Sequence, residues 1–373
     1  MTVFTNARLV LPDDVVEGGL TVENGLITAL DAPEDGYDFE GDYLMPGLID
    51  LHTDNLERQA QPRTNARWPS RSALLIHDAQ CAAAGITTVF DALCLGDLGF
   101  EKERNDTFHN GYADLAALAP TGALKVDHLL HLRCELPATE MPDMLKSVLH
   151  DDLVRMLSIM DHAPGIGGQY KDEERYRRMR AAEGHSIELI DRTIAEMRDL
   201  HHTNYASNRA WVMEQARARH IPLASHDDAT LDDILRNQAD GISIAEFPVS
   251  LEAAKMAKAR GMRVIGGAPN IVRGGSHSGN VAVMDLVRQN LLDALASDYV
   301  PAAMLEAAMV TVLQGALSMS QAVALITSGP ADIAELTDRG RIALGQRGDL
   351  IQVRFYGDLP VIRSVWRGGQ RIA

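Results

Sequence analysis

Ionisable side chains end several short apolar runs in this 373-residue chain. The first case is GLIDLHTDNLERQAQPR, residues 47–63, where an apolar run finishes in His52 and Asp54. Side chains two residues apart point to the same side of a β-strand, so this imidazole and this carboxylate are predicted to lie together. Imidazole nitrogens and carboxylate oxygens bind zinc, manganese, iron and similar ions, so the pair indicates a metal site.

The same pattern recurs along the chain. Other apolar runs end in Glu135, Asp161, His162, His226, Asp227, Asp228, Glu246 and Asp298. Each member alone has an ordinary explanation, because a single histidine is often a hydrogen-bonded core residue and Asp227 with Asp228 could cap a following helix. Together they favour a metal site, and the number of carboxylates indicates that two ions could share a bridging group.

The elements that would position these groups form a regular series. Between residues 46 and 338, eight apolar runs alternate with helical segments: GLIDLHTD, GITTVFDAL, DHLLHLRCE, VRMLSIMDH, IPLASHDD, GISIAEFP, RVIGGAPN and ALASDY. This rhythm predicts an α/β protein with a parallel (β/α)₈ TIM-like barrel, whose functional residues lie at the C-terminal ends of the strands. An open doubly wound sheet is the alternative, but no GxGxxG follows the first run.

The two chain ends have a different pattern. Residues 1–45 and 339–373 alternate apolar and polar positions, with turns expected at Asn24-Gly25 and Gly368-Gly369. Each end is too short to form a stable domain separately, so we expect one small β-sandwich domain built from both. A helical insertion is expected around residues 165–218. Its charged run, residues 169–180, suits a solvated helix, and a basic lid over the substrate is the alternative.

Composition excludes some classes of partner. The formal net charge of −17 argues against general binding to nucleic acid or to an anionic membrane, and an anionic substrate would need metal ions or a local basic pocket. The uncharged stretch 307–331 is interpreted as two helices with a cap between them rather than a membrane span. Three cysteines without CxxC spacing and an N-terminus unlike a signal peptide favour the cytoplasm.

One loop is a candidate phosphate site. After the seventh run, the residues with suitable donors or flexible backbone are Arg273, Gly274, Gly275, Ser276, His277 and Asn280. Backbone N–H groups of glycines and a bidentate guanidinium both suit phosphate oxygens, although a flexible barrel loop has the same composition. Arg58 and Arg133 are further cationic candidates, and Arg133 could equally be a structural partner of Glu135, with which it shares a strand face.

Other histidines receive structural interpretations. His185, His201 and His202 lie in charged helical surroundings and are interpreted as surface residues. His128 and His131 are interpreted as barrel packing, because neither has a partner at ligand spacing.

These motifs together carry a resemblance to a known group of enzymes. A domain built from both chain ends, around a barrel whose first strand ends PGLIDLHTD, resembles the amidohydrolase superfamily, although Asp54 stands where most members have a second histidine. Longer blocks narrow the match: LHTDNLE, HLRCELP, SIMDHAPG, LASHDDAT, IAEFP, GAPNIVRGGSHSGN and LASDYVPA. They are similar to the α-D-ribose 1-methylphosphonate 5-triphosphate diphosphatase family of the carbon–phosphorus lyase pathway.

The resemblance implies metal-dependent hydrolysis of a ribosyl phosphonate triphosphate to its 5-phosphate and pyrophosphate. It implies one or two divalent ions (zinc, manganese, iron and magnesium are not distinguished), held by His52, Asp54, Glu135, His162, His226 and Asp298. Glu135 would take the bridging position, and Asp298 would orient the attacking water and accept its proton. The sixth run offers Glu246, as ligand or as partner of a ligand, where relatives usually have a histidine, and His162 could replace that nitrogen.

Other functions remain open at this point. One is a nucleotide diphosphatase of broader specificity, and another is a metal-dependent deaminase or cyclic-amide hydrolase, against which the Arg273 loop argues. A metal-free scaffold subunit is the alternative from a different class, but such proteins lose strand-end ligands. The expected partner is a small molecule, and homo-oligomers are common among related barrels.

Overall fold

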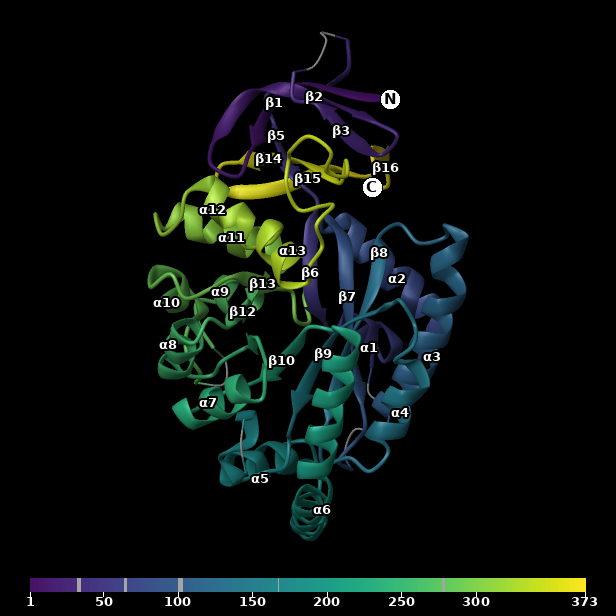
Figure 1. Ribbon diagram of the computed structural model, residues 1–373, viewed down its shortest axis with the longest axis vertical. Coiled ribbons are helices and arrows are strands. Elements are labelled where there is room, and N and C mark those ends of the chain that lie inside the picture. The colour runs from purple at the N-terminus through teal and green to yellow at the C-terminus, as the bar shows by residue number, and fades with distance from the viewer. Residues whose placement is uncertain (32–34, 64–65, 100–102, 167, 277–278) are drawn as a thin grey trace. The chain divides into compact units, whose positions relative to one another are not determined.

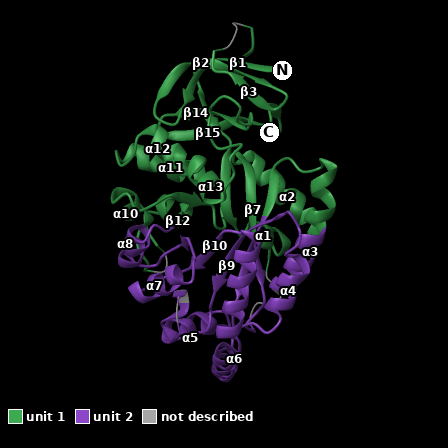
Figure 2. Ribbon diagram, viewed as in Figure 1, with its two compact units in different colours: residues 1–91, 114–129, 265–373 green, residues 92–113, 130–264 purple. Residues whose placement is uncertain are grey.

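The computed structural model describes residues 1–31, 35–63, 66–99, 103–166, 168–276 and 279–373 (Figure 1). The chain divides into two compact units (Figure 2). Unit 1 comprises Met1–Asp91, Asp114–Leu129 and Ile265–Ala373, and unit 2 comprises Ala92–Ala113 and Leu130–Val264.

Eight parallel strands form one sheet in the order β6 to β13. They are β6 (Leu48–Thr53), β7 (Ile86–Leu95), β8 (Asp127–Glu135), β9 (Val154–Met160), β10 (Leu223–His226), β11 (Ile244–Glu246), β12 (Arg263–Gly267) and β13 (Ala294–Ala296). Each predicted run contains one strand. The last and first meet through a parallel bridge between Thr53 and Asp298, so the sheet is nearly closed and the predicted barrel is confirmed.

Helices connect these strands. They are α1 (Asn55–Ala60), α2 (Ser70–Ala83), α3 (Glu103–Leu118), α4 (Met141–Val148), α5 (Glu173–Ala182), α6 (Ile187–Arg219), α7 (Leu231–Ala239), α8 (Leu251–Ala259), α9 (Ala268–Val272), α10 (Val283–Arg288), α11 (Ala303–Leu313), α12 (Met319–Ala324) and α13 (Ser328–Ile333). A capping box of Thr230 and Asp233 begins α7, so Asp227 and Asp228 are not its caps.

The uncharged stretch 307–331 is divided between separate helices. Leu313 ends α11, and a capping box of Ser318 and Gln321 starts α12. Reciprocal side-chain bonds of this kind satisfy N–H groups that a helix start leaves without partners. Among the described residues, no helix is both long enough and apolar enough to cross a membrane.

A second sheet, mainly antiparallel, contains both ends of the chain. Its order is β16-β15-β14-β5-β1-β2-β3, with β4 beside β1. The strands are β1 (Thr2–Val10), β2 (Val15–Glu23), β3 (Leu26–Ala29), β4 (Tyr37–Asp38), β5 (Tyr43–Pro46), β14 (Leu350–Tyr356), β15 (Leu359–Arg367) and β16 (Gln370–Arg371). Asn24 and Gly25 have φ of +51° and +84°, as a type I′ hairpin requires.

The terminal sheet has its own apolar core. Phe4, Phe39 and Trp366 are buried in contact with one another, with ring centroids 5.0 to 5.7 Å apart. Residues from both ends of the chain therefore share one core, which confirms the predicted terminal domain as an element of the fold. Its boundaries at residues 45 and 339 stay a prediction.

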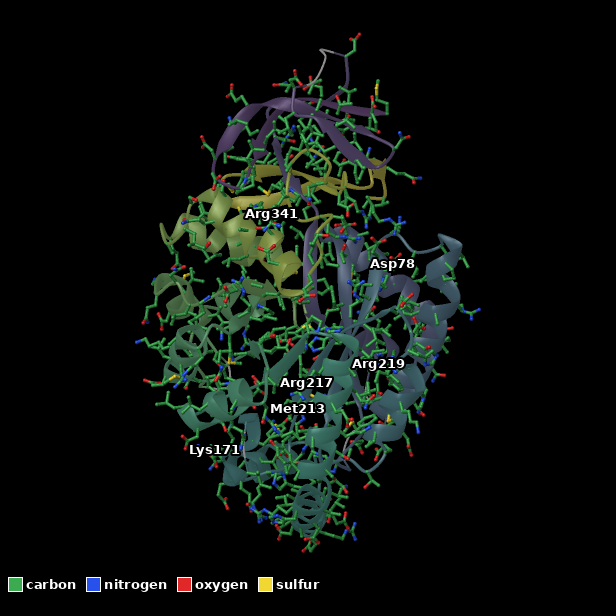
Figure 3. All side chains as sticks on the ribbon, in the orientation of Figure 1. Asp78, Lys171, Met213, Arg217, Arg219 and Arg341 are labelled. Carbon is green, nitrogen blue, oxygen red and sulfur yellow. The ribbon has the colours of Figure 1, made fainter. Side chains whose placement is uncertain are left out.

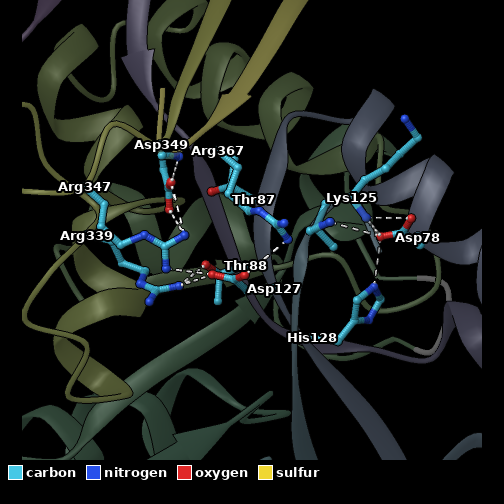
Figure 4. Close-up of polar contacts among 12 residues, drawn as sticks. Asp78, Thr87, Thr88, Lys125, Asp127, His128, Arg339, Arg347, Asp349 and Arg367 are labelled. Carbon is cyan, nitrogen blue, oxygen red and sulfur yellow. Dashed lines mark hydrogen bonds and ion pairs between the residues drawn. The ribbon is translucent and has the colours of Figure 1, made fainter. Parts of the chain in front are cut away.

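Asp127, at the start of β8, ties the C-terminal segment to the barrel within unit 1 (Figure 4). Its carboxylate accepts hydrogen bonds from Arg339 and Arg347 at 2.8 and 2.7 Å and from Arg367 at 3.3 Å. Burial acts to raise the pKa of Asp127, but the three guanidinium groups outweigh it and hold that pKa below its usual value. The cluster is a charged anchor at the N-terminal end of a barrel strand.

Candidate metal centre and substrate site

Three predicted ligands of unit 1 lie together where β6 and β13 end. His52 Nε2 is 3.5 Å from Asp54 Oδ1, and one donor atom each of His52, Asp54 and Asp298 lie within 4.8 Å of one another. Backbone hydrogen bonds hold them, because Asp298 N–H donates to the His52 carbonyl and Asp54 N–H to the Asp298 carbonyl. Asp298 has φ of +57°, a left-handed conformation that costs energy in residues other than glycine and is common at functional sites.

Asp50 of β6 forms hydrogen bonds with the backbone beside these three residues. One of its carboxylate oxygens accepts hydrogen bonds from the backbone N–H of Ser297, at 3.0 Å, and of His52, at 3.3 Å. Burial raises the pKa of Asp50 to about 6, although the contacts with Ser297 and His52 oppose that shift. The Asp50 side chain therefore joins the predicted ligand His52 to Ser297, the residue just before the predicted ligand Asp298. The sequence analysis did not single it out, although its spacing of two from His52 placed it on the same strand face.

Glu135 and His162 form a close pair in unit 2. His162 Nδ1 lies 2.5 Å from one Glu135 oxygen, and the His162 backbone N–H donates to the other at 2.9 Å. Burial acts to raise the pKa of Glu135, but His162 outweighs it and lowers that pKa. For His162, burial lowers the pKa, and Glu135 reverses the effect and raises it. Buried Arg133 opposes protonation of His162, so this guanidinium belongs to the same electrostatic group.

His226 and Glu246 form a second group in unit 2. His226 Nε2 lies 4.0 Å from Glu246 Oε2, and His131 Nε2 lies 3.8 Å from that same oxygen. His131 and Glu246 are both fully buried. The interpretation of His131 as barrel packing therefore missed its place beside Glu246. The signal was present, because His131, Arg133 and Glu135 alternate along β8 and share one face of the strand.

The donor sets of both units suit divalent ions. Each donor set combines imidazole nitrogens with carboxylate oxygens at the C-terminal ends of barrel strands. Mixed ligands of this kind bind zinc, manganese and iron. Asp227 also contributes charge in unit 2, since its Oδ2 lies 3.0 Å from His226 Nδ1. Both units of the barrel therefore carry clusters of histidine and acidic residues at the ends of their strands.

A series of buried hydrogen bonds holds Asn55, the residue that follows Asp54. Asn55 is 2% exposed and its side-chain amide donates to Nδ1 of His77 at 2.9 Å. His77 must then carry its proton on Nε2, which lies 2.6 Å from Asp91 Oδ1. The start of α1 is therefore held by groups from α2 and β7, which lie far apart in the sequence.

These hydrogen bonds continue to a second buried histidine, His128, whose contact with Asp78 is drawn in Figure 4. His128 Nδ1 lies 2.8 Å from Asp91 Oδ2, and His128 Nε2 lies 3.3 Å from Asp78 Oδ1. Burial disfavours a charged imidazole, but Asp91 and Asp78 outweigh that effect and raise the pKa of His128 to about 9. His128 is therefore a doubly protonated bridge between two carboxylates, and its interpretation as simple packing was incomplete.

Tyr299 contacts both Arg273 of the candidate phosphate loop and Arg58 of α1. Arg273 NH1 donates to the Tyr299 hydroxyl at 3.4 Å, and Arg58 NH1 donates to the Tyr299 carbonyl at 3.3 Å. Both guanidinium groups are exposed, so each can reach an anion. Tyr299 was not identified from the sequence. It contacts two predicted substrate-binding residues, of which one follows β6 and the other follows β12.

The glycines of that loop are engaged locally. Gly274 N–H donates to the Ile271 carbonyl, and Gly275 N–H donates to the Asn270 carbonyl at 2.8 Å. Both have positive φ, +79° and +148°, which explains why glycine occupies them. These two N–H groups therefore support the turn after α9. Ser276 and Asn280 are partly exposed, and His277 lies outside the described residues.

The helical insertion contains α5 and α6. The expected pair of Glu173 and Arg177 is present at 2.7 Å, and Arg180 is paired with Glu183 at 2.9 Å. Lys171, labelled in Figure 3, is exposed ahead of α5. In these pairs, arginines of α5 are neutralised by nearby glutamates, as expected for a solvated helix. The alternative interpretation of this segment as a lid over the substrate stays a prediction.

The surface interpretation of His201 was wrong. Its side chain is 18% exposed, and its Nδ1 lies 2.8 Å from Asp161 Oδ2 at the end of β9. His202, the next residue, is exposed as expected. His201 lines a pocket of unit 2 that also includes the predicted ligand His226.

Comparisons with known proteins agree with this geometry. No protein-family model matches the chain. The chain is 39% identical over 383 residues to the alpha-D-ribose 1-methylphosphonate 5-triphosphate diphosphatase of Escherichia coli (strain K12), covering 99% of this chain and 100% of that protein.

Solved structures share the fold at low identity. The 5-methylcytosine deaminase from Klebsiella pneumoniae has a TM-score of 0.65 and 13% identity, with 100% of this chain and 97% of that chain covered. An amidohydrolase crystal structure has a TM-score of 0.61 and 17% identity, with 99% and 98% covered. At such identities the likeness concerns the fold alone, which is that of amidohydrolases.

Proposed function

The chain belongs to the α-D-ribose 1-methylphosphonate 5-triphosphate diphosphatase family, and on that premise we propose the chemistry of its barrel. The protein is a hydrolase of phosphoric anhydride bonds. It cleaves the triphosphate of the ribosyl methylphosphonate to the 5-phosphate and pyrophosphate, a step of phosphonate catabolism. The full-length identity of 39% carries this conclusion, and it does not favour amide hydrolysis, deamination or a scaffold role.

Six residues are proposed as metal ligands. They are His52, Asp54 and Asp298 in unit 1 and Glu135, His162 and His226 in unit 2. Clustered donor atoms support the first set, and the contact of Glu135 with His162 supports the second. Bound divalent ions supply charge neutralisation for phosphate oxygens and lower the pKa of water. One or two ions fit these donors, and zinc, manganese, iron and magnesium are all compatible with them.

Asp298 is proposed as the proton acceptor. Water attacks the phosphorus nearest the ribose, the bond from that phosphorus to its bridging oxygen breaks, and pyrophosphate leaves with the bond electrons. The Asp298 carboxylate takes the proton of the attacking water. Its backbone bonds to His52 and Asp54 support this role, because they limit the movement of the carboxylate.

Cationic side chains are proposed to bind the triphosphate. Arg273 and Arg58 are exposed and are linked through Tyr299, which limits their freedom before substrate binds. A planar guanidinium can bind two phosphate oxygens at once. Ser276, His277 and Asn280 complete the proposed loop site, with Gly274 and Gly275 forming its turn, and Arg133 is proposed as a contact in unit 2.

The cellular setting follows from the substrate and the composition. The three cysteines are buried and unbridged, which supports a reducing cytoplasm. The net charge of −17 gives no general attraction to nucleic acid or to anionic lipid. A homo-oligomer stays a prediction, which analytical ultracentrifugation of the purified protein would test.

The deciding experiment follows phosphorus by NMR while metal content is measured. The purified enzyme is given the ribosyl methylphosphonate triphosphate, ATP or GTP in separate reactions. We expect pyrophosphate from the ribosyl compound and strong loss of its formation in Asp298→Asn. Equal turnover of all three would make the protein a broader nucleotide diphosphatase, and no turnover of any would refute the proposed function.

A further inference from the structure

A small pocket in unit 2 lies beside the predicted ligand His226. Its volume is about 240 Å³, and it opens among the ends of β9 and β10 and the helices α6 and α7. Pockets for drug-sized ligands measure roughly 300–1,000 Å³, so this one suits a fragment about the size of a monosaccharide. Apart from His226, none of the proposed metal ligands and none of the described residues of the phosphate loop lines this pocket.

One face of α6 forms its aromatic side. His201, Tyr205 and Arg209 are spaced four residues apart, so they lie in a row along the helix, and all three line the pocket. The rings of His201 and Tyr205 have centroids 4.7 Å apart with an interplanar angle of 32°. The contact between His201 and Asp161 at 2.8 Å fixes the imidazole. This wall is therefore a pre-oriented pair of tilted, stacked rings, against which the C–H face of a sugar ring can pack.

The lining of the pocket is also rich in hydrogen-bond acceptors. It includes Asp161, Asp227, Asp228 and Asp233, together with two arginines that are already paired. Arg209 is bound to Asp240 at 2.7 Å and Arg236 to Asp233 at 3.1 Å. An ionised carboxylate only accepts hydrogen bonds, so it selects hydroxyl donors and repels phosphate or phosphonate.

The floor of the pocket is rigid. Ser225 donates to Asp228 at 2.5 Å, Asn237 donates to the other oxygen of Asp228 at 2.7 Å, and Arg209 donates to Asn237 at 2.8 Å. All four residues are buried. Because each polar group there has a partner, the floor does not need a ligand, whereas the carboxylate of Asp161 keeps lone pairs for one.

We propose that this pocket binds the ribose ring of the substrate, with the 2- and 3-hydroxyl groups donating to carboxylates led by Asp161 and the ring face on His201 and Tyr205. The inference rests on the proposed function, because that substrate carries these two free hydroxyls between its charged ends. It assigns specificity to the insertion helix α6 and separates sugar recognition from phosphate binding.

The test compares His201→Ala with His202→Ala, a matched change of the adjacent, exposed residue of the same helix. Turnover of the ribosyl methylphosphonate triphosphate and of inorganic tripolyphosphate, which has no sugar, gives a ratio of kcat/KM values. We expect that ratio to fall about tenfold or more in His201→Ala, which corresponds to about 1.4 kcal/mol, and to stay within twofold of wild type in His202→Ala. An equal fall for both substrates would overturn the proposal.

Binding separates this inference from the proposed function. Calorimetry measures ribose 5-phosphate and its 2-deoxy and 3-deoxy analogues with wild type and both variants, without any turnover. Loss of a hydroxyl should weaken binding to wild type and His202→Ala, and should cost less in His201→Ala, where the subsite is already damaged. If His201→Ala binds ribose 5-phosphate as wild type does, the pocket is not the sugar site, whatever the enzyme hydrolyses.

Discussion

The backbone N–H of Asp54 donates a hydrogen bond to the carbonyl of Asp298 at 2.7 Å. This bond joins the first strand of the barrel to the last, and it carries two proposed ligands. The side chains of Asp54 and Asp298 therefore extend from the backbone that closes the barrel sheet. A substitution of either side chain that leaves this hydrogen bond intact is expected to change the chemistry of the site without moving its backbone.

Asp298→Asn tests the proton acceptor. The amide keeps the size of the side chain but cannot accept the proton, so kcat should fall by roughly 10²–10⁴. Metal content, measured by mass spectrometry, should fall less than activity does. Asp285→Asn, at an exposed position of α10, is the control and should retain activity. Complete loss of metal in Asp298→Asn would mean that the residue acts as a ligand alone.

Glu135→Gln tests the pair with His162. The amide removes the charge that holds the pKa of His162 above its usual value, and it removes an anionic donor for metal. Bound metal per chain should drop, and turnover should recover partly when excess divalent ion is added. Unchanged metal content with full activity would show that the contact is structural.

Arg273→Lys tests the phosphate loop. Lysine keeps the charge but loses the planar fork that binds two oxygens and the contact with Tyr299. KM for the ribosyl triphosphate should rise about tenfold, with a smaller change in kcat. Arg288→Lys, an exposed change on α10, should leave both constants unchanged. A KM equal to that of wild type would remove Arg273 from the substrate site.

His128→Asn tests the series of buried hydrogen bonds that holds Asn55. The pKa of His128 is raised to about 9, so its protonation stabilises the fold fully below its ordinary value near 6.5 and this contribution disappears as pH rises through 9. The variant should lose on the order of 2–4 kcal/mol at pH 6, and the gap to wild type should narrow towards pH 9. Urea unfolding at several pH values measures this.

The control for that prediction is His150→Asn, which changes an exposed histidine. Its unfolding free energy should follow wild type at every pH. A gap between wild type and His128→Asn that does not depend on pH would show that His128 contributes packing rather than charge.

Asp127→Asn tests the anchor of the C-terminal segment. Three arginines would lose their shared anion, and we expect a loss of roughly 2–4 kcal/mol in unfolding free energy, because these groups are partly buried. Asp358→Asn, in an exposed turn, should change stability by less than about 0.5 kcal/mol. Calorimetric unfolding measures both, and equal melting temperatures would show that the cluster contributes nothing.

Much of the fold was predictable because its signals are local. Each barrel strand is a short apolar run, and the period of two along β6 predicts that His52 lies with Asp54, whose side chain is 3.5 Å away. The hairpin at Asn24-Gly25 was predictable for a similar reason, since only residues that tolerate positive φ fit that turn. The ligands proposed at the strand ends were chosen because the C-terminal strand ends of such a barrel carry function.

The features that escaped prediction depend on packing between distant segments. His77, Asp91 and His128 come from α2, β7 and β8, and no spacing along the chain indicates that they meet. His201 was missed for a different reason: its spacing from the buried Ile194 and Met197 places it on the covered face of α6, but its polar type led to the surface interpretation. Tyr299 likewise joins Arg58 to Arg273 only once the barrel has closed.

The shared terminal sheet has a consequence for synthesis of the chain. β14 pairs with β5, and Gln352 of β14 also donates to Asp42, 310 residues earlier, so one edge of β5 has no partner until almost the whole polypeptide has been made. An unpaired strand edge readily joins other chains. During synthesis, that edge of β5 is therefore open to pairing with other chains until β14 has emerged.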